Sequence, residues 1–189
     1  MGDLLNAIDL FARDTDSVIE YGAGESTVRL AEMGCTVVSV ETSWNYFLSM
    51  TERLANPILE GRVHLVYADI GKVDQWGSPI DATPRASFLR YPLHPWVQKE
   101  RLGLSPRLII LDGRFRLASF VTSFLRAPVG AFILINNFYS RPDYQLVNYF
   151  TQESERIGDL AIFEVTEKGR QVLDSDLMLS FSASFLNPL

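Results

Sequence analysis

The chain has 189 residues, of which 47% are hydrophobic and 21% are charged, so it is long enough to bury the core of one ordinary domain. No apolar run approaches the roughly 20 residues that a membrane span needs, and we expect neither a membrane anchor nor a secretory signal. A single cysteine, Cys35, excludes an internal disulfide bond and favours a reducing, cytoplasmic location. The net charge of −6 argues against a broad nucleic-acid-binding surface.

The first 70 residues are predicted to alternate between helices and strands. Apolar residues at helical spacing indicate the helices, and serine, glycine and proline mark several of their ends. Short β-branched and apolar runs indicate the strands. In chain order the expected elements are a helix over 4–13, a strand over 17–20, a helix over 26–34, a strand over 36–40, a helix over 43–57 and a strand over 63–68.

Residues 71–106 interrupt this alternation, because the segment contains five prolines and three glycines. We predict a long irregular insertion there, and long ordered loops often act as lids over functional sites. The expected organisation is therefore a single domain over residues 1–189 with a lid-like insertion at about 71–106.

The alternation resumes after the insertion. The later elements are predicted as strands over 107–111 and 131–135, helices over 115–126 and 140–155, and two late strands over 161–166 and 177–184. Five short apolar strands that alternate with helices imply an α/β protein with a parallel sheet covered on both faces. The two closing strands are expected to be antiparallel.

The strongest functional signal is the segment from Glu20 to Thr27, in which a buried strand passes through a glycine turn into a helix. Gly22 can adopt a backbone conformation closed to other residues, and Gly24 lets a ligand approach the main chain. The start of the helix offers free N–H groups that suit a carboxylate or a phosphate. Thr27 stands where the dinucleotide fingerprint has its third glycine, which argues against a nicotinamide-dependent oxidoreductase.

Acidic residues also follow the next strands. Glu41 ends the second strand, where it can accept hydrogen bonds from both hydroxyls of a ribose. Asp69 and Asp112 end the third and fourth strands, and ligands of parallel sheets bind at this edge. Strand-end acids can instead simply cap helices or begin turns. The ordered set beside the glycine turn favours a ligand-binding crevice.

These residues resemble the successive cofactor motifs of class I S-adenosylmethionine-dependent methyltransferases, and the resemblance covers nearly the whole chain. Further segments resemble a small bacterial group of methyltransferase-like proteins of unassigned substrate. The segments that carry the likeness are Glu20-Tyr21-Gly22-Ala23-Gly24, Glu41, Asp69-Ile70-Gly71, Trp76-Gly77, Tyr91-Pro92-Leu93, Trp96 and Leu111-Asp112-Gly113-Arg114-Phe115-Arg116.

The resemblance implies a three-layer sandwich with a mostly parallel seven-stranded sheet, strand order 3-2-1-4-5-7-6, in which the last strand is antiparallel. It also implies methyl transfer from S-adenosylmethionine to a small molecule. Glu20 and the glycine turn would hold the amino-acid part of the cofactor, Glu41 the ribose, Asp69 and Ile70 the adenine, and Asp112 would lie beside the reactive methyl group. The residues implied to contact S-adenosylmethionine are Glu20, Gly22, Ala23, Gly24, Ser26, Glu41, Thr42, Asp69, Ile70 and Asp112.

The catalytic residues are less clearly marked, and Asp112 and Arg114 are the candidates. Asp112 and Asn136-Asn137 resemble the magnesium ligands of catechol-type methyltransferases with one carboxylate lost, so we predict no catalytic metal. Arg114 and Arg116 either grip an acidic substrate group or pair with surface acids.

Two alternatives to a methyltransferase stay open. A non-catalytic or repurposed binding module of the same fold would explain the lost metal carboxylate and the lack of a lysine base after Asp112. A nicotinamide-dependent oxidoreductase is the weaker alternative. The short segment before the first strand leaves little chain for a substrate cap and favours a homodimer.

Overall fold

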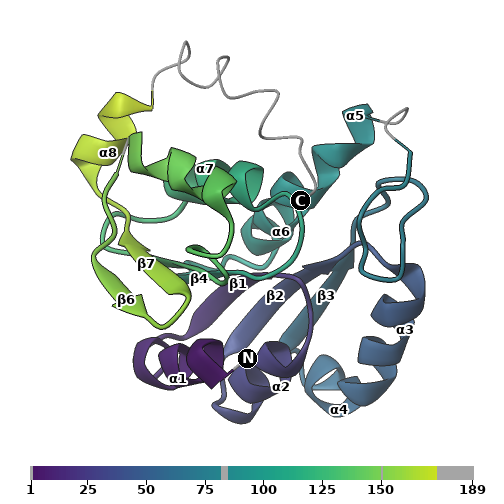
Figure 1. Cartoon of the computed structure of the whole chain (residues 1–189). Coiled ribbons are helices and arrows are strands. Elements are labelled where there is room, and N and C mark those ends of the chain that lie inside the picture. Colours follow the sequence, from purple (N-terminus) through teal and green to yellow (C-terminus); the bar gives the residue numbers. More distant parts are fainter. Residues whose placement is uncertain (1, 82–84, 150, 174–189) are drawn as a thin grey trace.

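A computed structural model describes residues 2–81, 85–149 and 151–173, which form three layers (Figure 1). A seven-stranded sheet lies in the middle. Helices α1 to α4 cover one face, and α5 to α8 cover the other. The helices are α1 (Gly2–Phe11), α2 (Glu25–Glu32), α3 (Trp44–Arg53), α4 (Ala55–Leu59), α5 (Arg85–Phe88), α6 (Arg90–Arg101), α7 (Arg116–Arg126) and α8 (Glu167–Val172), with a 3₁₀ helix, η1, at Pro142–Tyr149.

The sheet has the strand order β3-β2-β1-β4-β5-β7-β6, which confirms the predicted fold class. Strands β1 to β5 are parallel, and β7 runs antiparallel to both of its neighbours. The strands are β1 (Ser17–Tyr21), β2 (Thr36–Glu41), β3 (Val63–Tyr67), β4 (Leu108–Leu111), β5 (Phe132–Ile135), β6 (Glu155–Ile157) and β7 (Leu160–Glu164).

The end of the sheet is built from other residues than the sequence predicts. The predicted strand over 161–166 is β7, but its partner is β6, which precedes it in the chain. The chain turns at Gly158, which has a positive φ of 58°, so the two strands form a short hairpin. The described residues of the segment predicted as a helix over 140–155 form η1 and, at the end, the first residue of β6. The predicted strand over 177–184 lies outside the described residues.

Residues 71–106 are also more regular than the sequence predicts, because they contain α5 and the 12-residue helix α6. Pro92 is the third residue of α6, where the N–H group that proline lacks would have no helical partner. Pro95 lies inside the helix and removes one hydrogen bond. Burial of Tyr91 and Trp96 against the sheet compensates for this loss, since packing supplies most helical stability in proteins.

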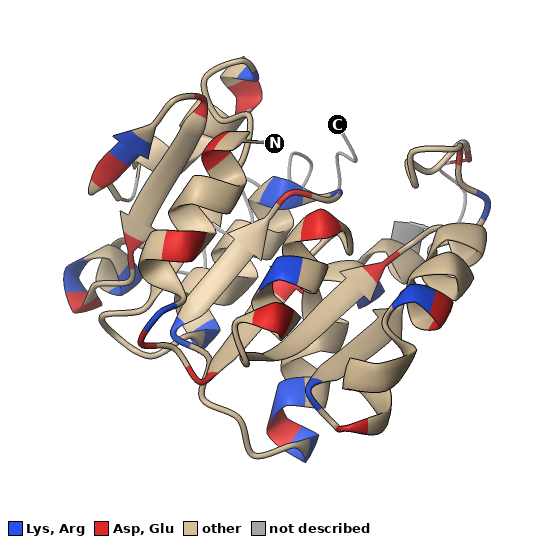
Figure 2. Cartoon of the chain, turned by 90° about the horizontal axis from the view of Figure 1, so that it is seen from below, with Lys and Arg blue, Asp and Glu red and all other residues tan. Residues whose placement is uncertain are grey.

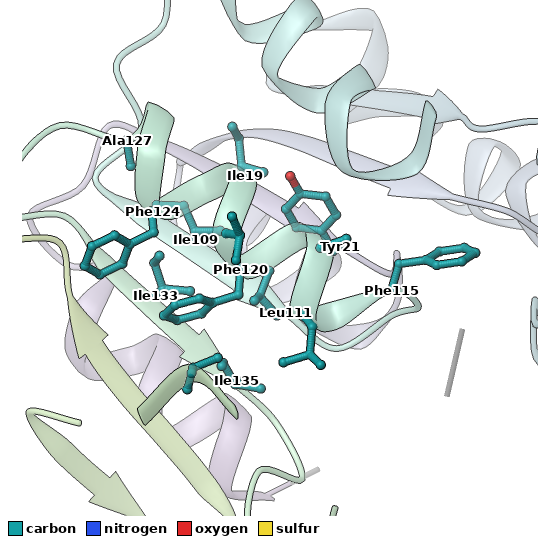
Figure 3. Packing of buried hydrophobic residues seen from close by; sticks show 14 of the residues in the cluster. Ile19, Tyr21, Ile109, Leu111, Phe115, Phe120, Phe124, Ala127, Ile133 and Ile135 are labelled. Atoms are coloured by element: carbon teal, nitrogen blue, oxygen red, sulfur yellow. The ribbon is translucent and has the colours of Figure 1, made fainter. Parts of the chain in front are cut away.

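Apolar side chains fill both spaces between the sheet and its helices. Figure 3 shows the packing on the α6 and α7 side, where Phe120 and Phe124 of α7 lie over Ile109, Ile133 and other strand residues. A second cluster, which includes Leu4, Ile8, Leu30, Val37 and Ile110, fills the opposite space. Both faces of the central strands are buried, as expected for parallel strands in an α/β protein.

Most charged residues lie outside these layers, and Glu20 and Arg116 are the buried exceptions among the described residues. Figure 2 shows most of the sheet in tan, with acidic and basic residues interspersed on the helices and loops. Within the described part of the chain, no helix has the length and apolar character to cross a membrane.

A buried hydrogen-bond chain joins α6 to the centre of the sheet. The indole N–H of Trp96 donates to the hydroxyl oxygen of Tyr21 at 2.9 Å, and that hydroxyl donates to the carbonyl oxygen of Pro92 at 2.8 Å. Both aromatic side chains are at most 1% exposed, so water cannot replace a lost partner.

We therefore expect Tyr21→Phe to lower the free energy of unfolding by about 1–3 kcal/mol, because it leaves the buried Trp96 indole N–H without a partner. Urea unfolding of the variant and the wild type measures this loss. Tyr67→Phe is the matched control, since the Tyr67 hydroxyl is not hydrogen-bonded to the described residues, and it should change stability by about 0.5 kcal/mol or less. Equal stability of the two variants would refute the anchoring role of Tyr21.

Candidate functional site

A cavity of about 560 Å³ opens at the carboxyl ends of β1, β2 and β4. Its volume lies in the range of small-molecule sites, and its position is where ligands bind in open parallel sheets. The lining residues are Leu4, Leu5, Gly22, Ala23, Gly24, Glu25, Ser26, Glu41, Thr42, Ser43, Tyr46, Gln75, Trp76, Tyr91, Asp112, Gly113, Arg114 and Asn137.

Two glycine turns meet on the floor of the cavity. Gly22 has a φ of 98°, and a Cβ atom built on it would lie 2.7 Å from the Gly113 Cα atom. Any side chain at Gly22 would therefore collide with the main chain after β4. Glycine is required here both for the backbone conformation and for the close approach of the two turns.

Helix α2 presents its uncapped start to this cavity. Gly24 occupies the N-cap position and has no side chain that could accept from the first N–H groups of the helix. The side chain of Ser26 is turned away, because its hydroxyl donates to Glu20. Gly24, Glu25 and Ser26 all line the cavity, so the positive end of the helix dipole faces the ligand space.

Glu20 lies beneath the cavity rather than in its wall. Its carboxylate is fully buried and accepts hydrogen bonds from Ser26 (2.5 Å), Thr27 (2.5 Å) and Ser39 (2.6 Å). Glu20 thereby joins β1 to β2 and to the first turn of α2. Burial raises the pKa of Glu20 to about 7, although the three hydroxyl groups oppose this shift.

Thr27, at the position of a third glycine, takes part in the same arrangement. Its hydroxyl donates to Glu20 and accepts from the Gly24 N–H at 2.8 Å, and its side chain is fully buried. The hydroxyl thus occupies the space behind the glycine turn and fixes the start of α2.

Glu41 offers one carboxylate oxygen to the cavity. Its Oε1 accepts from the N–H groups of Thr42 (2.7 Å) and Ser43 (2.8 Å) and lies 3.4 Å from the Thr42 hydroxyl. All of its hydrogen bonds to described residues use Oε1, which leaves Oε2 for a ligand. Burial raises the pKa of Glu41 above its usual value, and the two N–H groups and Arg114 oppose this shift.

Asp69 and Ile70 do not line the cavity. The Asp69 side chain is 62% exposed at the end of β3, where its Oδ1 accepts from the Gly71 N–H at 3.1 Å. The Ile70 side chain is buried in the core. The structure therefore brings together eight of the predicted site residues and separates Glu20, Asp69 and Ile70 from them: the eight are Gly22, Ala23, Gly24, Ser26, Glu41, Thr42, Asp112 and Arg114.

The loop that follows β3 covers one side of the cavity. The Asp74 carboxylate accepts from the N–H groups of Trp76 (2.8 Å) and Ser78 (2.9 Å), which closes the loop into a tight turn. The Thr42 hydroxyl donates to the Gly77 carbonyl oxygen at 2.8 Å, and Arg114 Nε donates to the Trp76 carbonyl oxygen at 3.0 Å. Arg114 thus holds this loop against the cavity.

The sequence predicts that Arg116 either grips an acidic substrate group or pairs with a surface acid. In the structure it does neither, because it is buried at the start of α7. Its Nε donates to the Gly113 carbonyl oxygen at 2.9 Å. Its Nη2 donates to the main-chain oxygen of Asp112 (2.6 Å) and to Oδ1 of the same residue (3.0 Å). Its Nη1 donates to the carbonyl oxygen of Asn136 and reaches Asn137 Oδ1 at 3.4 Å. The ends of β4 and β5 are therefore joined through one guanidinium.

Several solved structures resemble this arrangement. A methyltransferase-like protein from Silicibacter pomeroyi is 28% identical with a TM-score of 0.86, over 98% of this chain and 95% of that protein. The O-methyltransferase TomG from Streptomyces achromogenes, solved with S-adenosylmethionine, is 15% identical with a TM-score of 0.56, over 87% and 79%. An O-methyltransferase from Bacillus cereus, solved with S-adenosylhomocysteine, is 14% identical with a TM-score of 0.51, over 96% and 68%.

This chain has the class I methyltransferase fold. The resemblance stated from the sequence is thereby confirmed. No protein-family model matches the chain, and no curated protein matches it.

Sequence reasoning about this methyltransferase fold missed Tyr46, which lines the cavity together with Trp76 and Tyr91 of the segments that carry the likeness. Tyr91 is buried, and its hydroxyl accepts from the Arg114 N–H at 3.1 Å. Tyr46 stands on the first turn of α3, three residues after the N-cap Ser43. This position after the second strand is a signal that could have been read from the sequence.

The buried carboxylate of Glu20 gives a testable pH dependence. A folded-state pKa near 7, against 4.5 in the unfolded chain, means that folding retains a proton between these values. The stabilising effect is complete below pH 4.5 and is lost as the pH rises through 7. We expect wild-type stability, relative to Glu20→Gln, to fall by about 2–3 kcal/mol between pH 5 and pH 8.

Urea unfolding of both proteins at several pH values measures this difference. Glu52→Gln is the matched control, because Glu52 is exposed on α3, and its stability should run parallel to that of the wild type. A Glu20→Gln curve that also runs parallel to the wild type would show that the pKa of Glu20 is not raised.

Proposed function

We propose that this protein binds S-adenosylmethionine in the cavity and transfers its methyl group to a small-molecule acceptor. One observation carries this proposal: the uncapped start of α2 and the Glu41 carboxylate lie around the same crevice. Only Oε1 of Glu41 is hydrogen-bonded to described residues, so Oε2 can meet a ligand. The similar structures solved with S-adenosylmethionine and S-adenosylhomocysteine support the choice of ligand.

The cavity matches the chemistry of this cofactor. The N–H groups at the start of α2, beside Ala23 and Gly24, suit the carboxylate of the methionine part. Oε2 of Glu41 can accept hydrogen bonds from the ribose hydroxyls. Asp112 places a carboxylate near the positively charged sulfonium and ammonium groups. We assign Asp69 to the exocyclic amine of the adenine, and Ile70, whose side chain is buried, would contact it through its main chain.

Bound S-adenosylmethionine supplies a methyl group activated by the sulfonium. In the transfer, a lone pair of the acceptor would form the new bond to carbon, the carbon–sulfur pair would stay on sulfur, and the acceptor's proton would pass to water. Such a displacement depends mainly on positioning, which the two rigid glycine turns provide. Asp112 and Arg114 are the residues of this chain that we propose to act at the reacting end.

We propose further that the acceptor is a small molecule, and that the protein acts in the cytoplasm as a homodimer. The negative net charge disfavours nucleic acids. The exposed apolar side chains of Trp44, Leu48 and Leu59 on α3 and α4 support a contact between copies.

Isothermal titration calorimetry with S-adenosylmethionine and S-adenosylhomocysteine tests the proposed cofactor. We expect Glu41→Ala to weaken binding by about tenfold to a hundredfold, because each ribose hydroxyl loses a charged acceptor. Glu52→Ala, which changes an exposed acid outside the cavity, should bind as the wild type does.

Three other outcomes would change the assignment. If about 1 mM ligand gives no heat and no thermal shift, the proposed cofactor is refuted. Tighter binding of NAD would point to an oxidoreductase. Cofactor binding without turnover over a broad panel of acceptors would favour a non-catalytic binding module.

A further inference from the structure

The carboxyl ends of β4 and β5 form a ring of oxygens around one point. The main-chain oxygens of Asp112, Gly113 and Asn136 belong to it, together with Asp112 Oδ1 and Asn137 Oδ1. Carboxylate, amide and carbonyl oxygens in such a ring are the ligands that a hard divalent cation requires. Here the ring surrounds the guanidinium of Arg116.

The residues present do not fit a divalent cation. Asp112 contributes the ring's one carboxylate, whereas hard cations favour several charged oxygens. Nowhere in the described ranges do three or more His, Cys, Asp or Glu side chains group in a way that could hold a metal ion. The guanidinium also occupies the position that the oxygens face, and the Arg116 side chain is only 6% exposed.

Arg116 is held there from several sides. Its neighbour Phe115 has a φ of 49°, an unusual left-handed conformation for a bulky residue, at the N-cap of α7. The Tyr144 ring lies 5.5 Å from the guanidinium carbon and faces it as a cation–π partner. The buried charge is thus paired, hydrogen-bonded and packed, as a buried ion must be.

We propose that the guanidinium of Arg116 takes the place of a divalent cation in this site and positions Asp112 toward the ligand. Arg116 and Asn136 Nδ2 (2.9 Å) both donate to Oδ1 of Asp112. Among the described residues no hydrogen bond is made to Oδ2, so this oxygen can meet a ligand in the cavity. Arg116 is a positioning residue, because it acts through Asp112.

The position of Arg116 restricts which methyl acceptors fit the site, an inference that rests on the proposed methyl transfer. A guanidinium whose donors all point at protein oxygens offers no open coordination positions. An acceptor therefore cannot be activated by chelation, as a vicinal diol is by a metal ion. The acceptors that fit carry a single nucleophilic group and need no second oxygen bound beside it.

The test is a titration with Mn²⁺, followed by electron paramagnetic resonance, of the full chain without any other ligand. The wild type and Asn137→Asp should both bind Mn²⁺ more weakly than about 1 mM, since Arg116 fills the ring and pairs with the added carboxylate. The double variant Arg116→Ala/Asn137→Asp removes the guanidinium and leaves two carboxylates. It should bind Mn²⁺ about tenfold or more tightly than Asn137→Asp.

Three results would overturn the proposal. One is a Mn²⁺ site in the wild type with a Kd below about 0.1 mM that Asp112→Asn removes. Another is such a site in Asn137→Asp. The third is a folded double variant that binds no more tightly than Asn137→Asp. If circular dichroism shows that the double variant is unfolded, the Asn137→Asp arm decides. That variant has two carboxylates in the ring, so Arg116 alone can exclude the ion there.

A second measurement separates this inference from the proposed function. The affinity of the wild type for S-adenosylmethionine should be the same, within about twofold, in Mg²⁺ and in EDTA. Affinity that requires Mg²⁺ would overturn the role of Arg116 while supporting the proposed cofactor. Failure to bind S-adenosylmethionine would refute the proposed function and leave the Mn²⁺ result as the test of Arg116.

Discussion

The close approach of two main-chain turns is the constraint on which the candidate site depends. The turn after β1 and the turn after β4 meet at Gly22 and Gly113, where there is no room for a Cβ atom on Gly22. The Asp112 N–H donates to the Tyr21 carbonyl oxygen at 3.0 Å, so the sheet's hydrogen bonding continues into this contact. Backbone geometry thereby sets the separation between the start of α2 and the Asp112 carboxylate.

Two buried ionisable side chains, Glu20 and Arg116, support these turns. Glu20 fixes the start of α2 through three hydroxyl groups, and Arg116 fixes the ends of β4 and β5 through five oxygens. A buried charge is costly unless it is fully hydrogen-bonded, and this cost penalises any rearrangement that loses a partner. Neither side chain lines the cavity, yet each holds in place residues that do.

The resemblance to methyltransferases predicts the sheet order. The sequence also predicts eight of the residues that line the cavity, because strand-end residues of parallel strands share one edge. It does not predict α6, because the prolines of this segment argue against a helix. The burial of Tyr91 and Trp96, which stabilises the helix, cannot be read from the sequence. The role of Arg116 was hidden for a similar reason. Its spacing of four residues from Asp112 is visible in the sequence, but the left-handed conformation of Phe115, the N-cap of α7, is a property of the folded chain.

The carboxylates of Glu41 and Asp112 are held in the same way. In each, one oxygen is held by fixed donors, from the main chain for Glu41 and from Arg116 and Asn136 for Asp112, and the other is left without a hydrogen bond from the described residues. A carboxylate held on one side does not have to reorient when a ligand arrives, so binding costs less conformational entropy. It also presents its charge in a fixed direction, which is what stabilises a cationic ligand at a partly buried site. This shared arrangement explains how a chain without a metal-binding cluster among its described residues can still offer an ordered, negatively charged pocket.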